Sequence, residues 1–265
     1  MVIPIYQIDA FASGPFRGNP AAVCPLERWL EDETLQAIAA ENNLSETAYY
    51  VREEGRYRLR WFTPTVEVDL CGHATLATAC VILELRMEIQ ASRVVFDSLS
   101  GELVVTRAGD LYTLDFPSRP PRACADEPAL FEALGARPAA FLRAAVCLCV
   151  FENEAQVRAL APDMAKLVRV DCSAVIATAP GTDCDFVSRF FAPAKGVPED
   201  PVTGSAHTTL IPYWSRRLGK KKLFARQISQ RGGELWCEDR GPRVGIGGRA
   251  VKYLEGQITV PSKRV

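Results

Sequence analysis

The chain of 265 residues carries a formal net charge of −1, with 48% hydrophobic and 24% charged residues. This composition can fill one large or two modest cores, and it lacks the basic surplus that binds nucleic acids or anionic membranes. No stretch approaches the ~18 apolar residues of a membrane helix, and the first residues do not resemble a signal peptide. We therefore expect a cytoplasmic protein without nucleic-acid or membrane partners.

The first half of the sequence mixes short strands with two helices. Residues 32–42 carry apolar side chains at helical spacing, with Asp32 as the expected N-cap. Residues 74–85 are almost wholly apolar, which predicts a helix that is buried on all sides. Segments rich in strand-forming residues predict strands at 3–11, 47–51, 57–62, 94–96, 102–106 and 112–116.

The second half repeats this plan less cleanly. Its patterns predict helices at 129–134, 164–167 and 208–218, and strands at 146–151 and 174–179. Residues 117–121 are proline-rich and form the expected linker. We therefore expect two domains, 1–117 and 122–265, with terminal strands that could cross between the halves. The mixture of strands and helices favours an α+β fold over repeated β-α-β units.

One phrase of the sequence occurs twice, which indicates an internal duplication. The copies are Arg60-Trp61-Phe62-Thr63-Pro64 before Gly72-His73-Ala74, and Arg189-Phe190-Phe191-Ala192-Pro193 before Gly204-Ser205-Ala206-His207. The arginines are offset by 129 positions and the glycines by 132, so a single three-residue insertion relates the copies. Duplicated modules fold into like halves. We expect two pseudo-symmetric domains, each a central helix wrapped by strands, with a site in the cleft between them.

Each copy leads into a glycine at the expected start of a helix. Unpaired N–H groups and the positive end of the helix dipole can hold an anion there. Gly72 and Gly204 would let a ligand approach the backbone closely. The alternative is that both glycines only make tight turns. Because the feature occurs twice, with His73 and Ser205 beside the glycines, we favour a carboxylate-binding site.

Four polar side chains are candidates for chemistry. His73 directly follows its glycine and can shuttle a proton, whereas His207 lies inside its helix and suits a structural role. Asp200 precedes the second glycine, although aspartate before proline is usually turn chemistry. Glu46 precedes a predicted strand, where a solvated charge is the simpler interpretation. The second-half counterpart of Glu46 is Val175, so a lone base there would return a proton to the same face of a substrate.

The nine cysteines are odd in number, scattered and without a CxxC pair. This pattern predicts free thiols in a reducing compartment. Cys71 precedes Gly72, but Thr203 precedes Gly204, so the sequence lacks the two opposed thiols of a two-base racemase. No local metal-ligand spacing and no glycine-rich nucleotide motif is present, so we expect neither a metal nor a cofactor.

Longer motifs run through nearly the whole chain. They are Asp9-Ala10-Phe11, Phe16-Arg17-Gly18-Asn19-Pro20-Ala21-Ala22-Val23, Leu44-Ser45-Glu46-Thr47-Ala48, Arg60-Trp61-Phe62-Thr63-Pro64, Leu70-Cys71-Gly72-His73-Ala74-Thr75 and Glu199-Asp200-Pro201-Val202-Thr203-Gly204-Ser205-Ala206-His207. In these motifs the chain resembles the PhzF-like family of phenazine-biosynthesis-type isomerases. The family includes the MAWD-binding-protein branch and lies within the diaminopimelate-epimerase-like superfamily.

The resemblance implies a cofactor-free isomerase whose glutamate falls on Glu46, and a homodimer. With the residue patterns, it assigns catalysis to Glu46, His73 and Asp200. It places substrate binding at Asn19, Gly72, Gly204 and Ser205. We expect Glu46 to move a proton on a small carboxylic acid. Two alternatives stay open: a racemase or epimerase that uses Cys71 without pyridoxal phosphate, and a non-enzymatic member of the fold that binds proteins.

Overall fold

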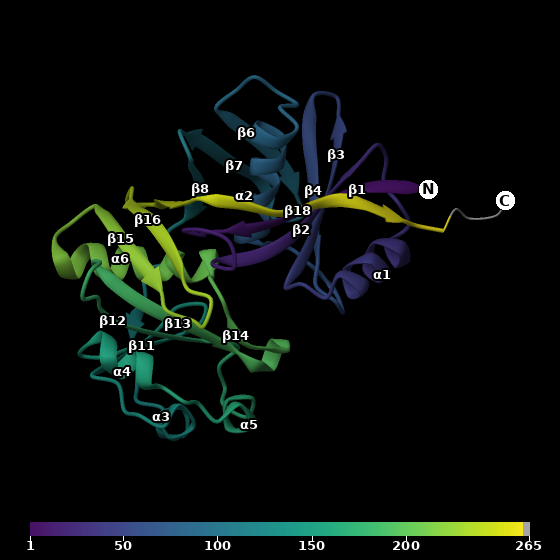
Figure 1. Ribbon diagram of the computed structural model, residues 1–265. Helices are drawn as coiled ribbons and strands as arrows, with labels where there is room; N and C mark the ends of the chain where they lie inside the picture. Colours follow the sequence, from purple (N-terminus) through teal and green to yellow (C-terminus); the bar gives the residue numbers. More distant parts are fainter. Residues whose placement is uncertain (262–265) are drawn as a thin grey trace. The chain divides into compact units, whose positions relative to one another are not determined.

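The computed structural model describes residues 1–261 and divides into two compact units (Figure 1). Unit 1 comprises Met1–Asp115 and the residues from Gly247 onward, and unit 2 comprises Phe116–Ile246. The last four residues of the expected second domain lie outside the described residues. Both units mix helices with parallel and antiparallel strand pairs, which confirms the α+β class. Within the described residues, no helix is both long and apolar enough to cross a membrane.

Unit 1 is built around one buried helix. Its elements are β1 (Val2–Ala10), β2 (Asn19–Leu26), α1 (Asp32–Asn42), β3 (Glu46–Glu53), β4 (Arg56–Phe62), β5 (Glu67–Val68), α2 (Gly72–Cys80), η1 (Val81–Leu85), β6 (Arg93–Ser98), β7 (Gly101–Ala108), β8 (Leu111–Pro117), which ends at the border of unit 2, and β18 (Ala250–Thr259).

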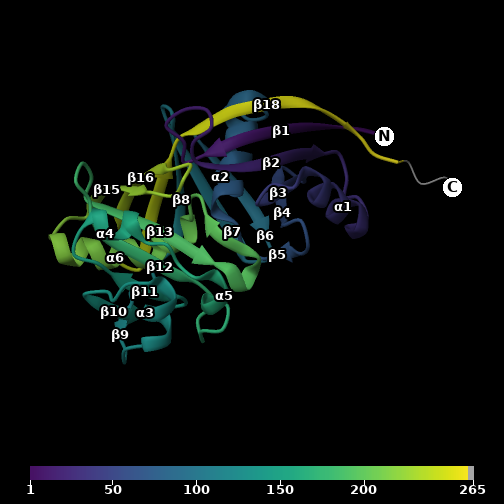
Figure 2. The same ribbon diagram turned by 60° about the horizontal axis from the view of Figure 1, so that its bottom comes forward.

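The central helix α2 is buried along its whole length, as its apolar sequence predicts. It packs against β1, β2, β3, β7 and β18, and it continues into the π-helical turn η1. Figure 2 shows β1, β2 and β18 passing beside it. The helix begins at Gly72, two residues before the predicted start.

The outer helix α1 has the predicted bounds, but the predicted cap is wrong. Glu31 occupies the N-cap position and makes no side-chain cap hydrogen bond. Asp32 is the first helical residue, and its carboxylate accepts a hydrogen bond of 2.9 Å from Arg60 instead. The apolar face of α1, which includes Leu35, packs on the sheet residue Tyr49. The hydroxyl of Tyr49 donates to the carbonyl of Leu35 over 2.7 Å.

The last strand, β18, completes the sheet of unit 1, and the sequence patterns did not predict it. It pairs antiparallel with β1, from Val2 opposite Thr259 to Ala10 opposite Ala250. On its other edge β1 pairs antiparallel with β2, and β2 pairs in parallel with β3. The order of these four strands is therefore β18-β1-β2-β3.

Unit 2 places helices on both faces of its strands. Its elements are β9 (Arg122–Ala123), α3 (Pro128–Leu134), β10 (Ala140–Arg143), β11 (Cys147–Val150), α4 (Glu154–Ala159), α5 (Met164–Leu167), β12 (Val175–Pro180), β13 (Phe186–Ala192), η2 (Pro193–Lys195), β14 (Val197–Asp200), α6 (Gly204–Leu218), β15 (Lys222–Gln227), β16 (Gly233–Asp239) and β17 (Arg243–Gly248), whose end belongs to unit 1.

The helix α6 begins at Gly204, four residues before the predicted start. Its Trp214 stacks on Phe186 with ring centroids 5.6 Å apart, and the indole N–H donates to Thr178 over 3.0 Å. The small helices α3, α4 and α5 pack with strand residues such as Ala177 in a second apolar cluster. Because successive side chains point to opposite faces of a strand, Thr178 faces α6 and Ala177 faces the small helices.

The same local arrangement occurs in both units. In unit 1, β4 pairs antiparallel with β5 and in parallel with β6; in unit 2, β13 pairs antiparallel with β14 and in parallel with β15. Arg60 makes two hydrogen bonds of 2.7 Å to Glu67. Arg189 makes two of 2.7 and 2.9 Å to Glu199. Each two-pronged contact fixes a short strand to its longer neighbour.

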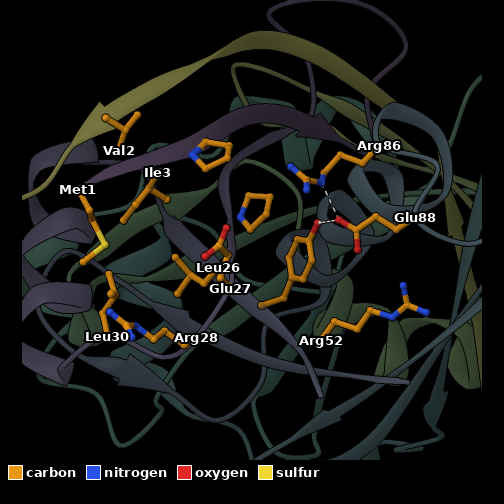
Figure 3. Close-up of a pocket in the computed structure, with 13 residues that line it drawn as sticks. Met1, Val2, Ile3, Leu26, Glu27, Arg28, Leu30, Arg52, Arg86 and Glu88 are labelled. Carbon is orange, nitrogen blue, oxygen red and sulfur yellow. Dashed lines mark hydrogen bonds and ion pairs between the residues drawn. The ribbon is translucent and has the colours of Figure 1, made fainter. Parts of the chain in front are cut away.

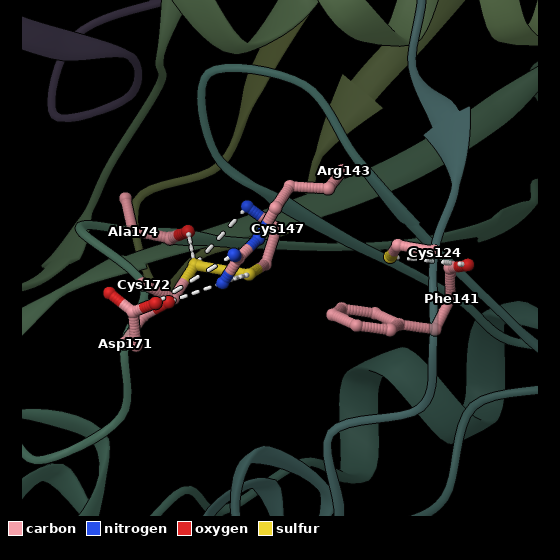
Figure 4. The surroundings of a disulfide bond; sticks show 7 residues. All are labelled: Cys124, Phe141, Arg143, Cys147, Asp171, Cys172 and Ala174. Carbon is pink, nitrogen blue, oxygen red and sulfur yellow. Dashed lines mark hydrogen bonds and ion pairs between the residues drawn. A yellow bond between two sulfur atoms is a disulfide. The ribbon is translucent and has the colours of Figure 1, made fainter.

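The expectation that all cysteines are free is wrong for one pair. Cys147, at the start of β11, is disulfide-bonded to Cys172 in the loop before β12, with Cα atoms 6.3 Å apart (Figure 4). The parallel pairing of β11 and β12 brings these segments together. The other seven cysteines are free, and Cys124 is exposed.

Candidate active site

Three candidate residues of unit 1 meet at the start of neighbouring elements. Asn19 is the first residue of β2, Glu46 is the first of β3, and His73 is the second of α2. Because β2 and β3 are parallel neighbours, both begin at the same edge of the sheet. Gly18 has φ of +71°, and a Cβ there would overlap the carbonyl oxygen of Ala10. Only glycine fits the turn that leads into Asn19.

The imidazole of His73 joins these residues. Its Nε2 lies 3.1 Å from Oε2 of Glu46, and its Nδ1 lies 3.2 Å from the amide nitrogen of Asn19. The thiol sulfur of Cys71 lies 3.5 Å from the same Nδ1. The hydroxyl of Ser45 donates to the amide oxygen of Asn19 over 3.4 Å. The ring is therefore held from both sides.

His73 and Glu46 lie close together, but their facing atoms do not form a well-aligned hydrogen bond. Both Nε2 and Oε2 are buried, and neither makes a well-aligned hydrogen bond to any described residue. Buried polar atoms rarely stay without a hydrogen-bond partner. Both atoms can therefore serve a third atom, as a bound ligand would provide.

Burial and charge act in opposite directions on this pair. Burial is the largest single influence and raises the pKa of Glu46. The charge of His73 and the side-chain contacts of the carboxylate with His73 and Cys71 together hold that pKa below its usual value. Burial likewise disfavours a charge on His73, yet its neighbours Cys71 and Glu46 raise the pKa of the imidazole well above its usual value. Both shifts favour an ionised Glu46 beside a protonated Nε2 of His73.

Cys71 takes a different state. Burial, followed by the charge of Glu46, raises the pKa of its thiol to about 11. The ligand atoms of Cys71, His73 and Glu46 lie within 4.8 Å of one another, as a metal site would require. However, His73 turns Nε2 to Glu46 and Nδ1 to Cys71, so neither ring nitrogen faces both other ligands. This arrangement suits proton transfer across the ring better than a shared ion.

The remaining candidates lie in unit 2, around the turn between β14 and α6. Asp200 ends β14 and accepts a hydrogen bond from the hydroxyl of Thr203. Gln227 is fully buried; its amide nitrogen donates to the carbonyl of Asp200 over 2.7 Å, and its amide oxygen accepts from the backbone of Thr203 over 2.9 Å. Gly204 then begins α6, and Ser205 is exposed. Sequence patterns missed Gln227, because nothing local connects it to this turn.

His207 stabilises the start of α6. Its Nδ1 donates to the carbonyl oxygen of Thr203 over 2.9 Å. Burial lowers the pKa of the ring to about 4, so it is neutral at pH 7. Asn19, Glu46, Gly72 and His73 thus belong to unit 1, and Asp200, Gly204 and Ser205 to unit 2.

Known proteins share both the sequence and the fold. The sequence pattern of the phenazine biosynthesis-like protein family (PhzC-PhzF) matches residues 8–256. An uncharacterized isomerase of Pseudomonas aeruginosa is 54% identical over 258 residues, which cover 97% of this chain and 99% of the relative. The human phenazine biosynthesis-like domain-containing protein is 40% identical over 288 residues, covering 98% of this chain and 100% of the relative.

A solved structure agrees. The crystal structure of a phenazine biosynthesis protein of the PhzF family from Enterococcus faecalis superposes with a TM-score of 0.96. It is 46% identical in sequence, and the match covers 98% of this chain and 100% of that one. The chain therefore belongs to the phenazine biosynthesis-like (PhzC-PhzF) family and is an isomerase of that family.

Proposed function

We propose that this isomerase moves a proton within a small carboxylic acid, without a cofactor, and that Glu46 is the general base and acid. The observation that supports this most directly is the buried contact of 3.1 Å between Glu46 and His73. Its two facing atoms lack aligned hydrogen bonds to described residues. A lowered pKa keeps Glu46 ionised and able to accept a proton at neutral pH.

The reaction we propose conserves every atom of the substrate. The carboxylate of Glu46 takes a proton from a substrate carbon, and the electron pair of the broken C–H bond moves into an adjacent unsaturated system. The carboxyl proton of Glu46 can exchange with solvent at this stage. The protonated Glu46 then gives a proton to a different carbon on the same face, where a new C–H bond forms. One base suffices for such a transfer, and the counterpart of Glu46 in the second half is Val175.

His73 would control the strength of this base. While its charge faces Glu46, it lowers the pKa of the carboxylate and weakens it as a base. A substrate oxygen that accepts the Nε2 proton would weaken that contact and strengthen Glu46 when the substrate is in place. Asn19 positions the opposite side of the ring through Nδ1.

We further propose that the substrate carboxylate binds to the backbone N–H groups at the helix starts, namely at Gly72 and at Gly204 with Ser205. Asp200 would contact a polar substituent of the substrate, held in place by Thr203 and Gln227. The internal duplication, the homodimer and the cytoplasmic location stay predictions.

Cys71 is the weaker candidate for the base. Its side chain is buried, and its pKa of about 11 leaves it a neutral thiol at pH 7. A thiol in that state is a poor proton acceptor. The state of Cys71 therefore supports glutamate catalysis over a thiol-based racemase.

Deuterium exchange tests the proposal. The wild type and Glu46→Gln are incubated in D₂O with a panel of cyclic and amino carboxylic acids, and deuterium incorporation is followed by NMR. We expect Glu46→Gln to slow incorporation by at least about 10²-fold, which is the lower range for general acid–base catalysis. Glu41→Gln, which changes an exposed glutamate of α1, is the matched control and should keep the rate.

The position of the label identifies the reaction. Deuterium at a carbon that gained a hydrogen indicates isomerisation, and deuterium at the carbon that lost one indicates epimerisation. Full turnover by Glu46→Gln would refute the role of Glu46.

A further inference from the structure

A pocket lies in unit 1, away from the Glu46–His73 pair. Its volume is about 790 Å³, enough for a small organic molecule. It is formed by the start of β1, the end of β2 with the following turn, the middle of β3 and the loop after η1. The residues that line it are Met1, Val2, Ile3, Pro4, Pro25, Leu26, Glu27, Arg28, Leu30, Tyr50, Arg52, Arg86 and Glu88.

The two sides of this pocket differ in chemistry. Figure 3 shows Met1, Val2 and Ile3 on one side, with Arg86 and Glu88 on the other. The side chains of Met1 and Val2 are unusually open for apolar groups, with 48% and 59% of their residues' surface exposed. A ligand that fits both sides therefore has an apolar body and a polar head.

The polar side carries surplus positive charge. Glu88 is already engaged, since its Oε1 accepts hydrogen bonds of 2.6 Å from both Tyr50 and Arg86. Arg52 packs over the ring of Tyr57 at 5.8 Å. Across residues 1–261, no carboxylate lies within ion-pair distance of Arg52 or of Arg28. On the polar side, Arg52 and Arg86 accompany the single carboxylate of Glu88 (Figure 3). Across the whole lining, three arginines accompany two glutamates in a chain whose net charge is −1.

The pocket is separate from the candidate active site. Tyr50 follows Glu46 by four residues along β3, which corresponds to about 13 Å of extended chain. Neither Asn19, Glu46 nor His73 lines the pocket. We propose that this pocket binds a small amphipathic anion, with an apolar chain or ring along Met1, Leu26 and Leu30 and a carboxylate near Arg52.

Calorimetry with simple probes tests this proposal on the full chain. Octanoate combines the two features, octanol lacks the charge, and acetate lacks the apolar body. We expect octanoate to saturate one site per chain and to bind at least about tenfold more tightly than octanol or acetate. Octanol lacks the charge-assisted contact to arginine, and acetate buries little apolar surface. Arg52→Gln should weaken octanoate by about tenfold. Arg58→Gln, an exposed arginine of β4 that pairs with Glu53, is the matched control and should bind normally.

Two outcomes would overturn the proposal. Equal affinities for octanoate and octanol would mean that no charge is recognised, and unchanged binding by Arg52→Gln would place the ligand elsewhere. A second copy of the chain could also cover this surface. If light scattering shows a dimer and octanoate binds only to the dissociated chain, the pocket is an interface and the proposal fails. Glu46→Gln should bind octanoate normally, so this result is independent of the isomerase proposal.

Discussion

Replacing Gln227 with leucine should lower the free energy of unfolding of unit 2 and disturb the position of Asp200. The fully buried amide makes hydrogen bonds to the carbonyl of Asp200 and to the backbone N–H of Thr203. Leucine has a similar volume but cannot make either hydrogen bond. Each orphaned buried group costs about 1–3 kcal/mol. Because Asp200 is only half-buried and its carbonyl can bind water, we expect a total loss of about 2–3 kcal/mol.

The melting temperature measures this effect. For a chain of this size, a loss of about 2–3 kcal/mol lowers Tm by roughly 5–10 °C. Differential scanning calorimetry compares Gln227→Leu with Gln257→Leu, which changes an exposed residue of β18. The comparison separates the loss of the hydrogen bonds of Gln227 from the general effect of introducing a leucine. A Tm change below about 1 °C for Gln227→Leu would refute the role that we give to the amide. If the network also positions Asp200, turnover at a temperature where the variant is folded should fall as well.

Two further predictions concern the ionisation of the unit 1 cluster. Because the pKa of Glu46 is lowered in the folded chain, its ionisation stabilises the native state above pH 4.5, and this stabilisation is lost as the pH falls through the lower pKa of the folded state. Because the pKa of His73 is raised, its protonation stabilises the native state below pH 6.5, and this stabilisation is lost as the pH rises through the higher pKa of the folded state. The urea midpoint of the wild type should therefore exceed that of His73→Gln by more between pH 4.5 and 6.5 than at pH 10. An equal difference between the two proteins in both pH ranges would contradict the ion pair. Iodoacetamide at pH 7.5 should modify exposed Cys124 well before Cys71, whose thiol has a pKa of about 11; peptide mass spectrometry that finds Cys71 modified first would contradict this.

Local patterns were enough to predict the elements whose burial is set by their own sequence. The apolar run after Gly72 predicted the buried helix α2, and the spacing of Leu35 and Ile38 predicted α1 with its bounds. The position of Glu46 before a strand and of His73 after a glycine also follows from sequence. Their separation of 3.1 Å does not, because it depends on the parallel pairing of β2 with β3 and on the approach of α2.

The features that local sequence patterns did not predict depend on contacts between residues far apart along the chain. β18 alternates only weakly in burial, and its partner β1 lies at the other end of the sequence. The disulfide between Cys147 and Cys172 spans 25 positions without any recognisable spacing. Gln227 reaches back to the turn after Asp200. In each case a strand pairing creates the contact, and strand partners cannot be identified from local periodicity.

The pairing of β1 with β18 makes unit 2 a continuous insertion in a discontinuous unit 1. During synthesis, unit 2 can leave the ribosome complete while the sheet of unit 1 still lacks an edge. Contacts of such high sequence separation form late, because the entropy of closing a long loop opposes them. Since α2 packs against both β1 and β18, the helix that carries His73 is fully enclosed only after the final strand has been translated. A chain that stalls before residue 250 would therefore expose this helix, and the proposed proton-transfer site would be completed only when β18 is in place.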